Sequence, residues 1–392
     1  MRKICVFTGS RAEYGLLKPL MEEIKKDRRL HLQVLVSGMH LSREFGLTVK
    51  EIEKDGFKIN EKVKMPLLSD KEKAIANSMG EGMMGFAKAY YRLKPDILVT
   101  LGDRFEVLSA AAAALPFRIP IAHLHGGEST EGLIDEAIRH AVTKMSHLHF
   151  VATKEYRNRV IQMGESPRRV FCFGMPGLDN INKIKATKRK NLFRELGIPQ
   201  NKKLGIVTYH PVTLDYNTAG GQITELLNSL GDFPEVFWTL TFSNADTGGR
   251  IINKKIKDFV TKYPARAKLF TSLGQRRYLS LLKESEVMVG NSSSGITEAP
   301  SFRLPVVNIG DRQRGRLRQK NIIDVPQCKK NLITRAIKKG LSKDFKNSLK
   351  YMKNIYKGNN ASKRIKDMLE SVNLGENLIK KKFYTLSQGR KI

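Results

Sequence analysis

Short apolar runs that alternate with helical patterns constrain the fold of this chain more than any other feature of its sequence. The apolar run 3–9 (KICVFTG) is followed by an amphipathic helical pattern over 13–27, and the alternation continues to about residue 180. Buried strands separated by helices are typical of parallel β-α-β units. The sequence therefore predicts an α/β fold with a parallel sheet in this part of the chain.

A second series of such runs begins after residue 190. The apolar runs of this series lie at 204–210, 236–243, 267–271, 287–291 and 305–310. The stretch 175–190 between the two series holds Pro, Gly and a basic run, which is typical of a connection between domains. We therefore predict two Rossmann-like domains with a central cleft, over residues 1–180 and 190–372, followed by a basic, flexible tail over 373–392.

Length and composition agree with this organisation. A chain of 392 residues exceeds the usual size of a single core, and its 41% apolar and 28% charged residues are typical of a soluble globular protein. No run approaches the ~18 apolar residues of a membrane helix, and the apolar run at the amino terminus is too short for a signal peptide. The three cysteines, Cys5, Cys172 and Cys328, are distant and unpatterned, which predicts reduced thiols in a cytoplasmic protein.

The formal net charge of +32 raises the question of a nucleic-acid partner. The basic residues, however, are spread along helical patterns such as 250–259, and no module combines them with aromatic residues. This distribution favours solvated lysine faces, so we predict no nucleic-acid partner. A small polyanionic substrate would also be attracted by such a field.

Residues that directly follow strands are the first candidates for a site, because ligands of open α/β sheets lie at the carboxyl ends of the strands. The first predicted strand leads into a glycine-containing turn with Arg11 and, nearby, Lys18, which suit an anionic group such as a phosphate. No GxGxxG fingerprint is present. Asp103 leaves the strand 96–102 beside Arg104, either as an acid/base group or as half of a structural ion pair.

The stretch 121–141 (IAHLHGGESTEGLIDEAIRHA) gathers groups that move protons around a Gly-Gly turn. These groups are His123, His125, Glu128, Glu131, Asp135, Arg139 and His140. Strand alternation predicts that His123 and His125 share a face, and helical spacing lets Asp135 pair with Arg139. An HxH spacing alone is weak evidence for a metal, and we interpret the second one, His147 and His149, as partly buried strand histidines. We predict that this turn forms the proton-handling wall of the cleft.

The second domain offers a complementary set of residues. His210 leaves a predicted strand just before Pro211, and the small-residue loop 291–295 (NSSSG) leads from a strand into a helix. Ser292, Ser293 and the N–H groups at that helix start suit a phosphate. Glu298, one turn later, is placed to accept hydrogen bonds from ribose hydroxyls, and Arg312 follows another strand. We predict that this domain binds a nucleoside diphosphate.

Several motifs over residues 1–370 closely resemble those of the hydrolysing UDP-N-acetylglucosamine 2-epimerases of the NeuC type, from the sialic and legionaminic acid pathways. In order they are TGSRAEYG, GMH, LGDRFE, HLHGGE, IRHAVTKMSHLHF, HPVT, SNADTG, GNSSSGITEAPS and GDRQRGR. The resemblance implies two domains of the glycosyltransferase B type, no metal or nicotinamide cofactor, and a homodimer. It also implies a reaction in which a base removes the C2 proton of the sugar while UDP leaves C1. Water then adds to the glycal-type intermediate to give N-acetylmannosamine and UDP.

The resemblance carries roles over to particular residues. Asp103, Asp135 and His210 match the acid/base positions of the family. The nucleotide side falls on Arg11, Ser292, Ser293, Glu298 and Arg312, and the SNADTG motif adds Asn244. One position departs, because the broader family often has a glutamate where His125 stands. The role of that glutamate therefore falls to His125, Glu128 or Glu131.

The identity of the substrate stays open at this point. UDP-N-acetylglucosamine is the first expectation. The same chemistry on a UDP-linked diacetamido-trideoxy sugar, or on GDP-N-acetylglucosamine, is an alternative, because residues that bind phosphate and ribose do not distinguish uracil from guanine. A glycosyltransferase of the same fold is a more distant alternative, since it would need an acceptor site and no carboxylate cluster around C2.

Overall fold

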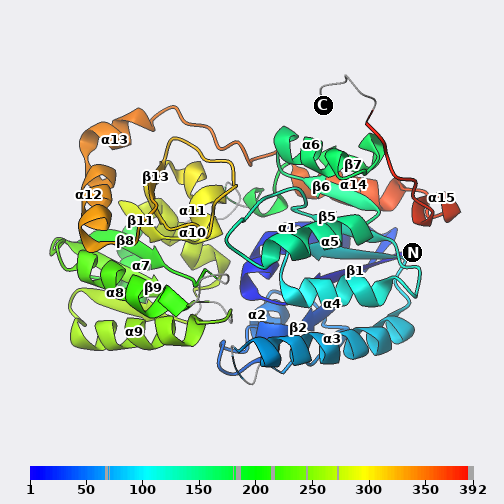
Figure 1. Ribbon diagram of the computed structural model, residues 1–392, viewed down its shortest axis with the longest axis horizontal. Coiled ribbons are helices and arrows are strands. Elements are labelled where there is room, and N and C mark those ends of the chain that lie inside the picture. The colour runs from blue at the N-terminus through cyan, green and yellow to red at the C-terminus, as the bar shows by residue number, and fades with distance from the viewer. Residues whose placement is uncertain are drawn as a thin grey trace.

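The computed structural model describes residues 1–66, 69, 71–179, 181, 187–212, 217–243, 246–271 and 273–386. Over these ranges the chain forms two parallel sheets, one in each half of the molecule, with helices around both (Figure 1). This arrangement confirms the predicted α/β fold with two Rossmann-like domains. No helix in the described ranges is long and apolar enough to cross a membrane.

The first sheet has the strand order β3-β2-β1-β4-β5-β6-β7. Its strands are β1 (Arg2–Thr8), β2 (Leu30–Ser37), β3 (Glu61–Val63), β4 (Ile97–Leu101), β5 (Ile121–Leu124), β6 (Leu148–Val151) and β7 (Val170–Cys172). The helices between them are α1 (Arg11–Lys26), α2 (Val49–Lys54), α3 (Glu72–Leu93), α4 (Phe105–Ala114), α5 (Asp135–Met145) and α6 (Lys154–Gln162). Successive side chains of β1 enter opposite apolar clusters: Ile4 and Val6 join the cluster with α1, and Cys5 and Phe7 the cluster with α3 and α4. The sheet is therefore buried on both faces.

The second sheet has the strand order β10-β9-β8-β11-β12-β13. Its strands are β8 (Lys203–Thr208), β9 (Val236–Thr241), β10 (Ala267–Phe270), β11 (Val287–Gly290), β12 (Val306–Ile309) and β13 (Ile322–Val325). Its helices are α7 (Arg189–Leu196), α8 (Ala219–Leu230), α9 (Gly249–Lys262), α10 (Gly274–Glu284), α11 (Ser293–Thr297), α12 (Lys330–Leu341) and α13 (Lys343–Ser348). Each predicted strand is present in the structure, and β3 and β13 are additional edge strands.

In both sheets the strand order reverses beside the first strand of the domain. The site lies at these two points of reversal. β1 lies between β2 and β4, and β8 lies between β9 and β11. At such a point the connections that follow neighbouring strands pass to opposite faces of the sheet, which leaves a crevice at the carboxyl ends. The segments after β1, β4, β8 and β11 therefore border the space between the domains.

The helix α14 (Ala361–Ser371) returns to the first domain (Figure 1), where it packs against α1. Its Ile365 and Leu369 are fully buried in the apolar cluster that also holds β1 and α1. The predicted boundary at residue 372 assigned this helix to the second domain. The structure differs because an amphipathic pattern predicts a buried face but not which sheet covers that face.

The segment after α14 continues along the first domain. Helix α15 (Glu376–Ile379) buries Leu378, and the Lys381 ammonium donates hydrogen bonds to the Ser146 carbonyl (2.7 Å) and to Glu165 Oε1 (2.8 Å). The tail predicted to be flexible over 373–392 thus has defined contacts as far as residue 386, and 387–392 lie outside the described residues. Residues 180 and 182–186 of the predicted connection between domains also lie outside them.

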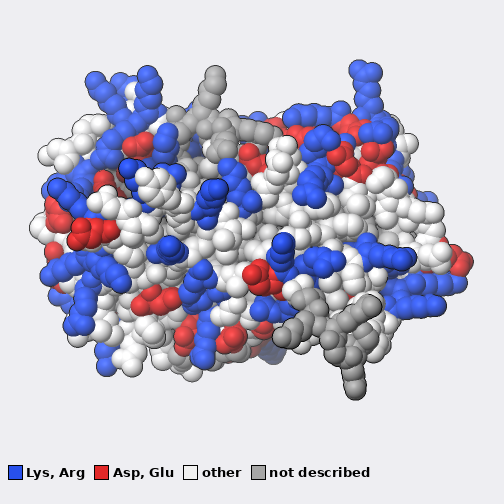
Figure 2. Space-filling model, turned by 90° about the horizontal axis from the view of Figure 1, so that it is seen from above, with Lys and Arg blue, Asp and Glu red and all other residues white. Residues whose placement is uncertain are grey.

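Basic residues are dispersed over the surface. In the view of Figure 2, Lys and Arg side chains lie over both domains, with Asp and Glu side chains among them. On this face the positive charge is therefore not gathered into one stripe, in agreement with its distribution along the sequence.

We predict that Leu369→Ala lowers the free energy of unfolding by about 2–5 kcal/mol, because it leaves a cavity in the core of the first domain. Hydrogen exchange should become faster in β1 and β2 and stay unchanged in β8 and β9. Ile355→Ala is the control, since Ile355 is 47% exposed, and its effect should stay within about 0.5 kcal/mol. Equal exchange in both domains after Leu369→Ala would contradict the assignment of α14 to the first domain.

Candidate active site

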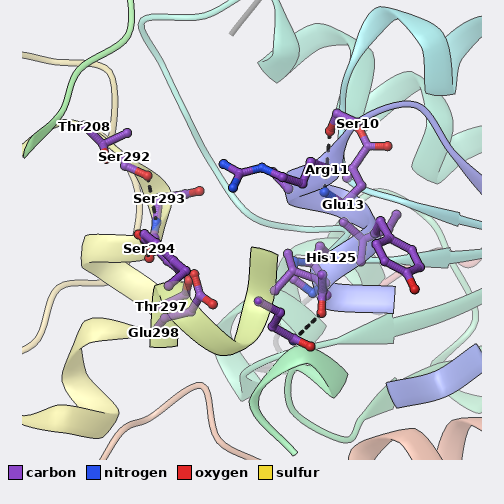
Figure 3. A pocket seen from close by; sticks show the side chains of 18 of the residues that line it. Ser10, Arg11, Glu13, His125, Thr208, Ser292, Ser293, Ser294, Thr297 and Glu298 are labelled. Carbon is purple, nitrogen blue, oxygen red and sulfur yellow. Dashed lines mark hydrogen bonds between the residues drawn. The ribbon is translucent and has the colours of Figure 1, made fainter. Parts of the chain in front are cut away.

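A cavity of about 1010 Å³ lies between the two domains. The first domain lines it with the turn after β1 and with Asp103, His125 and Asp135, and the second domain with His210, Arg312 and residues of α11. In Figure 3 the two walls face each other, and the Arg11 side chain extends from the first domain toward the serines of the second. The volume is that of a pocket for a small organic ligand.

Asp103, directly after β4, forms an ion pair with Arg139 of α5. Arg139 is 1% exposed and also donates to Thr130 Oγ1 (2.6 Å), to the Glu128 carbonyl (3.1 Å) and to Glu136 Oε2 (2.6 Å). The predicted pair between Asp135 and Arg139 is replaced by these contacts, because Arg139 turns toward the strand ends while Asp135 lines the cavity. Arg139 thus fixes the position of the Asp103 carboxylate.

Asp135 is the first residue of α5 and has a perturbed pKa. Burial of its carboxyl group, together with the nearby carboxylates of Asp103 and Asp246, raises its pKa to about 7. A carboxyl group with a pKa near neutrality both accepts and donates protons at physiological pH. Its position and its pKa suit an acid/base group in the cavity.

His125 lies just beyond β5 in an unusual backbone conformation. Its φ is +67°, in the left-handed region that residues other than glycine seldom adopt. The backbone N–H of His125 donates to the Phe150 carbonyl (3.1 Å), and Nδ1 lies 3.3 Å from Glu128 Oε1. Within the described residues, Nε2 is buried and has no hydrogen-bond partner. The strand ends at Leu124, so the prediction that His123 and His125 share one strand face was wrong.

Glu128 and Glu131, which the sequence offers as alternatives to His125, have different environments in the structure. Glu128 is 1% exposed, and its Oε2 lies 2.6 Å from Nη1 of Arg316. Burial alone would raise the pKa of Glu128, but Arg316, His125 and Arg139 together lower it to about 2. Glu131 is instead 53% exposed, pairs with Arg314 (3.0 Å) and does not line the cavity. Glu128 is therefore the ionised group beside His125.

His210, after β8, is held by residues from two neighbouring strand ends. Its Nδ1 lies 3.2 Å from Ser243 Oγ. The Asn291 side chain accepts from the His210 N–H and donates to the His210 carbonyl, both at 2.8 Å. Burial, and next the charge of Arg312, lower the pKa of His210 to about 3, so its imidazole is neutral at pH 7. The cavity thus contains an oriented, uncharged imidazole.

Arg104 and Arg312 share the buried carboxylate of Asp246. Arg104 Nη1 lies 3.0 Å from Asp246 Oδ1, and Arg312 Nη2 lies 3.6 Å from Oδ2. Arg104 also pairs with Glu106 at 3.1 Å. Burial would raise the pKa of Asp246, but Arg104 and Arg312 lower it. Because Arg104 belongs to the first domain and Asp246 to the second, this pair joins the two walls of the cavity.

Arg11 is the first residue of α1, whose start is capped. Ser10 Oγ accepts from the Glu13 N–H (3.5 Å), and Glu13 Oε2 accepts from the Gly9 N–H (2.7 Å). No acceptor in the described ranges pairs with the Arg11 guanidinium, which projects into the cavity. An anion is the natural partner of such a group.

The serine loop lies opposite Arg11. Ser292 Oγ accepts from the Ser294 N–H (3.3 Å) at the start of α11, and Ser293 and Glu298 line the cavity beside it. Burial raises the pKa of Glu298. Lys18 also lines the cavity, but its ammonium contacts Asp55 at 2.8 Å. Asn244 lies outside the described residues.

Three other histidines of the motif region, His123, His147 and His149, are buried in the first domain. His123 Nε2 is 2.7 Å from the Gly102 carbonyl, and burial lowers its pKa to about 3. His149 Nε2 is 3.1 Å from Glu165 Oε2, and His147 Nδ1 accepts from the Ile121 N–H (3.1 Å). These contacts support the interpretation of His147 and His149 as buried structural residues. No cluster of three His, Cys, Asp or Glu side chains that could hold a metal occurs in the described residues.

Sequence reasoning missed further ionisable residues of the site: Glu13 and Arg316 line the cavity, and the buried Asp246 joins its two walls through Arg104. Asp246 and Arg316 belong to the motifs SNADTG and GDRQRGR, but a motif does not tell which of its side chains crosses to the other domain. Glu13 is buried beside Glu106, and burial and that neighbour raise its pKa to about 8.

The model of the UDP-N-acetylglucosamine 2-epimerase family matches residues 22–370. A Campylobacter jejuni protein named GDP/UDP-N,N'-diacetylbacillosamine 2-epimerase (hydrolyzing) is 44% identical over 386 residues, covering 98% of this chain and 99% of that protein. The polysialic acid biosynthesis protein P7 of Escherichia coli is 38% identical over 378 residues, covering 95% of this chain and 96% of that protein.

The fold is similar to that of a solved structure, the UDP-GlcNAc 2-epimerase from Neisseria meningitidis bound to UDP-GlcNAc. The TM-score is 0.78 at 19% identity, and the match covers 94% of this chain and 99% of that one. This likeness supports the two-domain fold of the glycosyltransferase B type.

We predict that Asp135→Asn stabilises the protein in a pH-dependent way. The carboxyl group has a pKa of about 3.9 when unfolded and of about 7 when folded, so the folded state binds the proton more tightly. The stabilisation that this proton gives to the folded state is fully present below pH 4 and is lost as the pH rises to about 7. The melting-temperature gain of Asp135→Asn should therefore be small at pH 4, grow up to pH 7 and stay constant at pH 8. An equal gain at pH 4 and pH 8 would contradict the raised pKa.

Proposed function

The chain belongs to the UDP-N-acetylglucosamine 2-epimerase family, and we propose that it is a hydrolysing 2-epimerase of a nucleoside diphosphate-linked 2-acetamido sugar. The observation that carries this proposal is the cavity between the domains. There, the groups Asp103, His125 and Asp135 of the first domain, which can exchange protons, line the same space as the anion-binding groups Arg11, Ser292 and Ser293. A phosphorylated sugar that spans the cleft would place its ring among the former and its diphosphate among the latter.

Epimerisation through elimination and hydration sets a requirement that these residues meet. The C2 proton leaves from one face of the sugar and a proton returns to the other face, so two separate groups are needed. We propose Asp103, positioned by Arg139, as the base for the C2 proton, because it is delivered to the cavity by a strand end. Asp135 and His125 are the proposed proton donors. Asp135 suits this role because its pKa of about 7 keeps part of it protonated at neutral pH.

Departure of the nucleotide from C1 places negative charge on the diphosphate. Preorganised donors lower the barrier of such a step most when they lie in a closed, poorly solvated site. We propose that Arg11, Arg312 and the serine loop supply these donors, and that the neutral His210 donates a hydrogen bond to the leaving group. Water then adds at C1, and the sugar is released free.

We propose a nucleotide-linked N,N'-diacetylbacillosamine as the leading substrate, since the relative with 44% identity over 98% of this chain carries that sugar in its name. UDP-N-acetylglucosamine is the second candidate, favoured by the name of the matching family and by the likeness to the polysialic acid biosynthesis protein.

The test is incubation of the protein, without acceptor, with UDP-N-acetylglucosamine and with the UDP- and GDP-linked diacetamido sugars. A hydrolysing 2-epimerase should release a free 2-epimeric sugar and an equal amount of UDP or GDP from at least one of them. A glycosyltransferase would leave the sugar attached until an acceptor is added. Absence of turnover on all three substrates would reject the proposed function.

Asp103→Asn keeps the shape of the side chain and removes its basicity. We expect turnover to fall at least about 100-fold, the lower range for a positioned acid/base group. Asp258→Asn, at an exposed position on α9, is the control and should retain normal turnover. A folded Asp103→Asn variant with nearly normal turnover would show that Asp103 is not the base.

Arg312→Ala should weaken UDP binding by roughly 1.5–3 kcal/mol, because a charged hydrogen-bond donor to the nucleotide is lost. Titration calorimetry measures this change. Arg314→Ala is the matched control, since Arg314 lies two residues away in the same loop and is 66% exposed. Equal UDP affinity in both variants would place Arg312 outside the nucleotide site.

A further inference from the structure

The loop after β12 in the second domain docks on the turn that follows His125 in the first. The Arg314 carbonyl accepts from the Glu131 N–H at 3.1 Å. Gly315 has φ +88°, and a Cβ there would lie 2.4 Å from Ser129 Oγ, so only glycine allows this close approach. The two backbones therefore meet directly across the domain boundary.

Two tyrosines hold Leu317, which lies two residues further along the loop. The Leu317 N–H donates to Tyr156 Oη (3.2 Å), and Tyr356 Oη donates to the Leu317 carbonyl (2.8 Å). The two hydroxyl oxygens are 3.0 Å apart. Arg316 stands between Gly315 and Leu317, so both of its flanking residues are fixed against the first domain.

Arg316 is thereby delivered to a buried carboxylate that touches His125. Its Nη1 lies 2.6 Å from Glu128 Oε2, and its side chain is 10% exposed. The other oxygen, Glu128 Oε1, lies 3.3 Å from Nδ1 of His125 and has no hydrogen-bond partner among the described residues, so this carboxylate acts on the ring through its charge. The far atom of the ring, Nε2, is buried without a partner among the described residues, and His125 lines the cavity. Arg316, Glu128 and His125 thus form a row of contacts that runs from the second domain to the cavity wall of the first domain.

We propose that Arg316 is a positioning residue: through Glu128 it keeps a proton on Nδ1 of His125 and leaves Nε2 as the atom that exchanges a proton with the sugar. This inference rests on the proposed function. Arg316 keeps Glu128 ionised, and the negative charge of this carboxylate, 3.3 Å from Nδ1, stabilises the tautomer with the proton on Nδ1. When Nε2 takes up a proton, the ring becomes an imidazolium, and its Nδ1–H stays next to the Glu128 carboxylate. When Nε2 gives the proton back, the ring is neutral again with its proton on Nδ1.

The placement of Arg316 gives this arrangement a consequence. His125 and Glu128 belong to the first domain and Arg316 to the second, so the three groups form a line only when the cleft is closed. An imidazole that is oriented only after closure does not act before the substrate is shielded from water.

The test compares Arg316→Gln, which removes the charge, with Arg316→Lys, which keeps it. Arg314→Gln is the matched control, because Arg314 also reaches across the boundary, but to the exposed Glu131. Glu128→Gln removes the charge on the other side of the pair and serves as a second variant if Arg316→Gln fails to fold.

The first readout is the ¹⁵N NMR spectrum of the imidazole groups in the UDP-bound protein. The signals of His125 are identified by their loss in His125→Gln. In the wild type and in Arg314→Gln we expect the tautomer with the proton on Nδ1. Arg316→Gln and Glu128→Gln should shift the population toward the tautomer with the proton on Nε2, and Arg316→Lys should restore most of the wild-type state. An unchanged tautomer in Arg316→Gln and Glu128→Gln would overturn the proposal.

The second readout is turnover, combined with the affinity for UDP. Arg316→Gln should lower kcat by at least about tenfold, as loss of a group that orients a catalytic side chain does, with UDP affinity changed less than about twofold. In the His125→Gln background the same substitution should cause no further loss. An equal loss in both backgrounds would show that Arg316 acts elsewhere and overturn the proposal. A wild-type protein inactive on all three nucleotide sugars would reject the proposed function, and the NMR comparison alone would then decide the role of Arg316.

Discussion

Pairing of buried charge, within the first domain and across the domain boundary, is the constraint on which the rest of the structure depends. Strand ends deliver carboxylates into a closed space, where an unpaired charge costs several kcal/mol. Ion pairs with arginines compensate for this burial. Arg139 pairs with Asp103, and Arg104 pairs with Asp246 of the opposite domain. Asp135 has no ion-pair partner in the described residues, and its pKa accordingly rises to about 7. The one carboxyl group of this set left without an arginine is thus the one best tuned for proton exchange.

The sequence predicted most of the fold because the buried strands are apolar and the helices between them are amphipathic. Two edge strands, β3 and β13, escaped prediction because each buries only one residue and carries charged side chains, so neither forms a continuous apolar run. The return of α14 to the first domain also escaped it. The apolar face of that helix is visible in the sequence, but which of the two apolar cores covers it depends on the path of the chain after β13.

The candidate site was predictable wherever its residues directly follow a strand, as Asp103, His210 and Ser292 do. Interactions between distant segments were not. The partner of Asp103 is Arg139, 36 residues away, and the helical spacing of Asp135 and Arg139 suggested a nearer pair. The contact of Glu128 with Arg316 arises only when the two domains meet. The left-handed backbone of His125 has no signal in the sequence, because the residue that adopts it is not glycine.

The central claim is that this cavity carries out elimination followed by hydration at C1 and C2 of a nucleotide-linked sugar. The most direct measurement is a proton NMR spectrum of the reaction in D₂O with UDP-N-acetylglucosamine and with UDP-linked N,N'-diacetylbacillosamine. We expect the accepted substrate to give free sugar of inverted C2 configuration with deuterium at C2, and one equivalent of UDP. A free sugar that retains its C2 proton would contradict the account, because the bond at C1 would then be hydrolysed without any chemistry at C2.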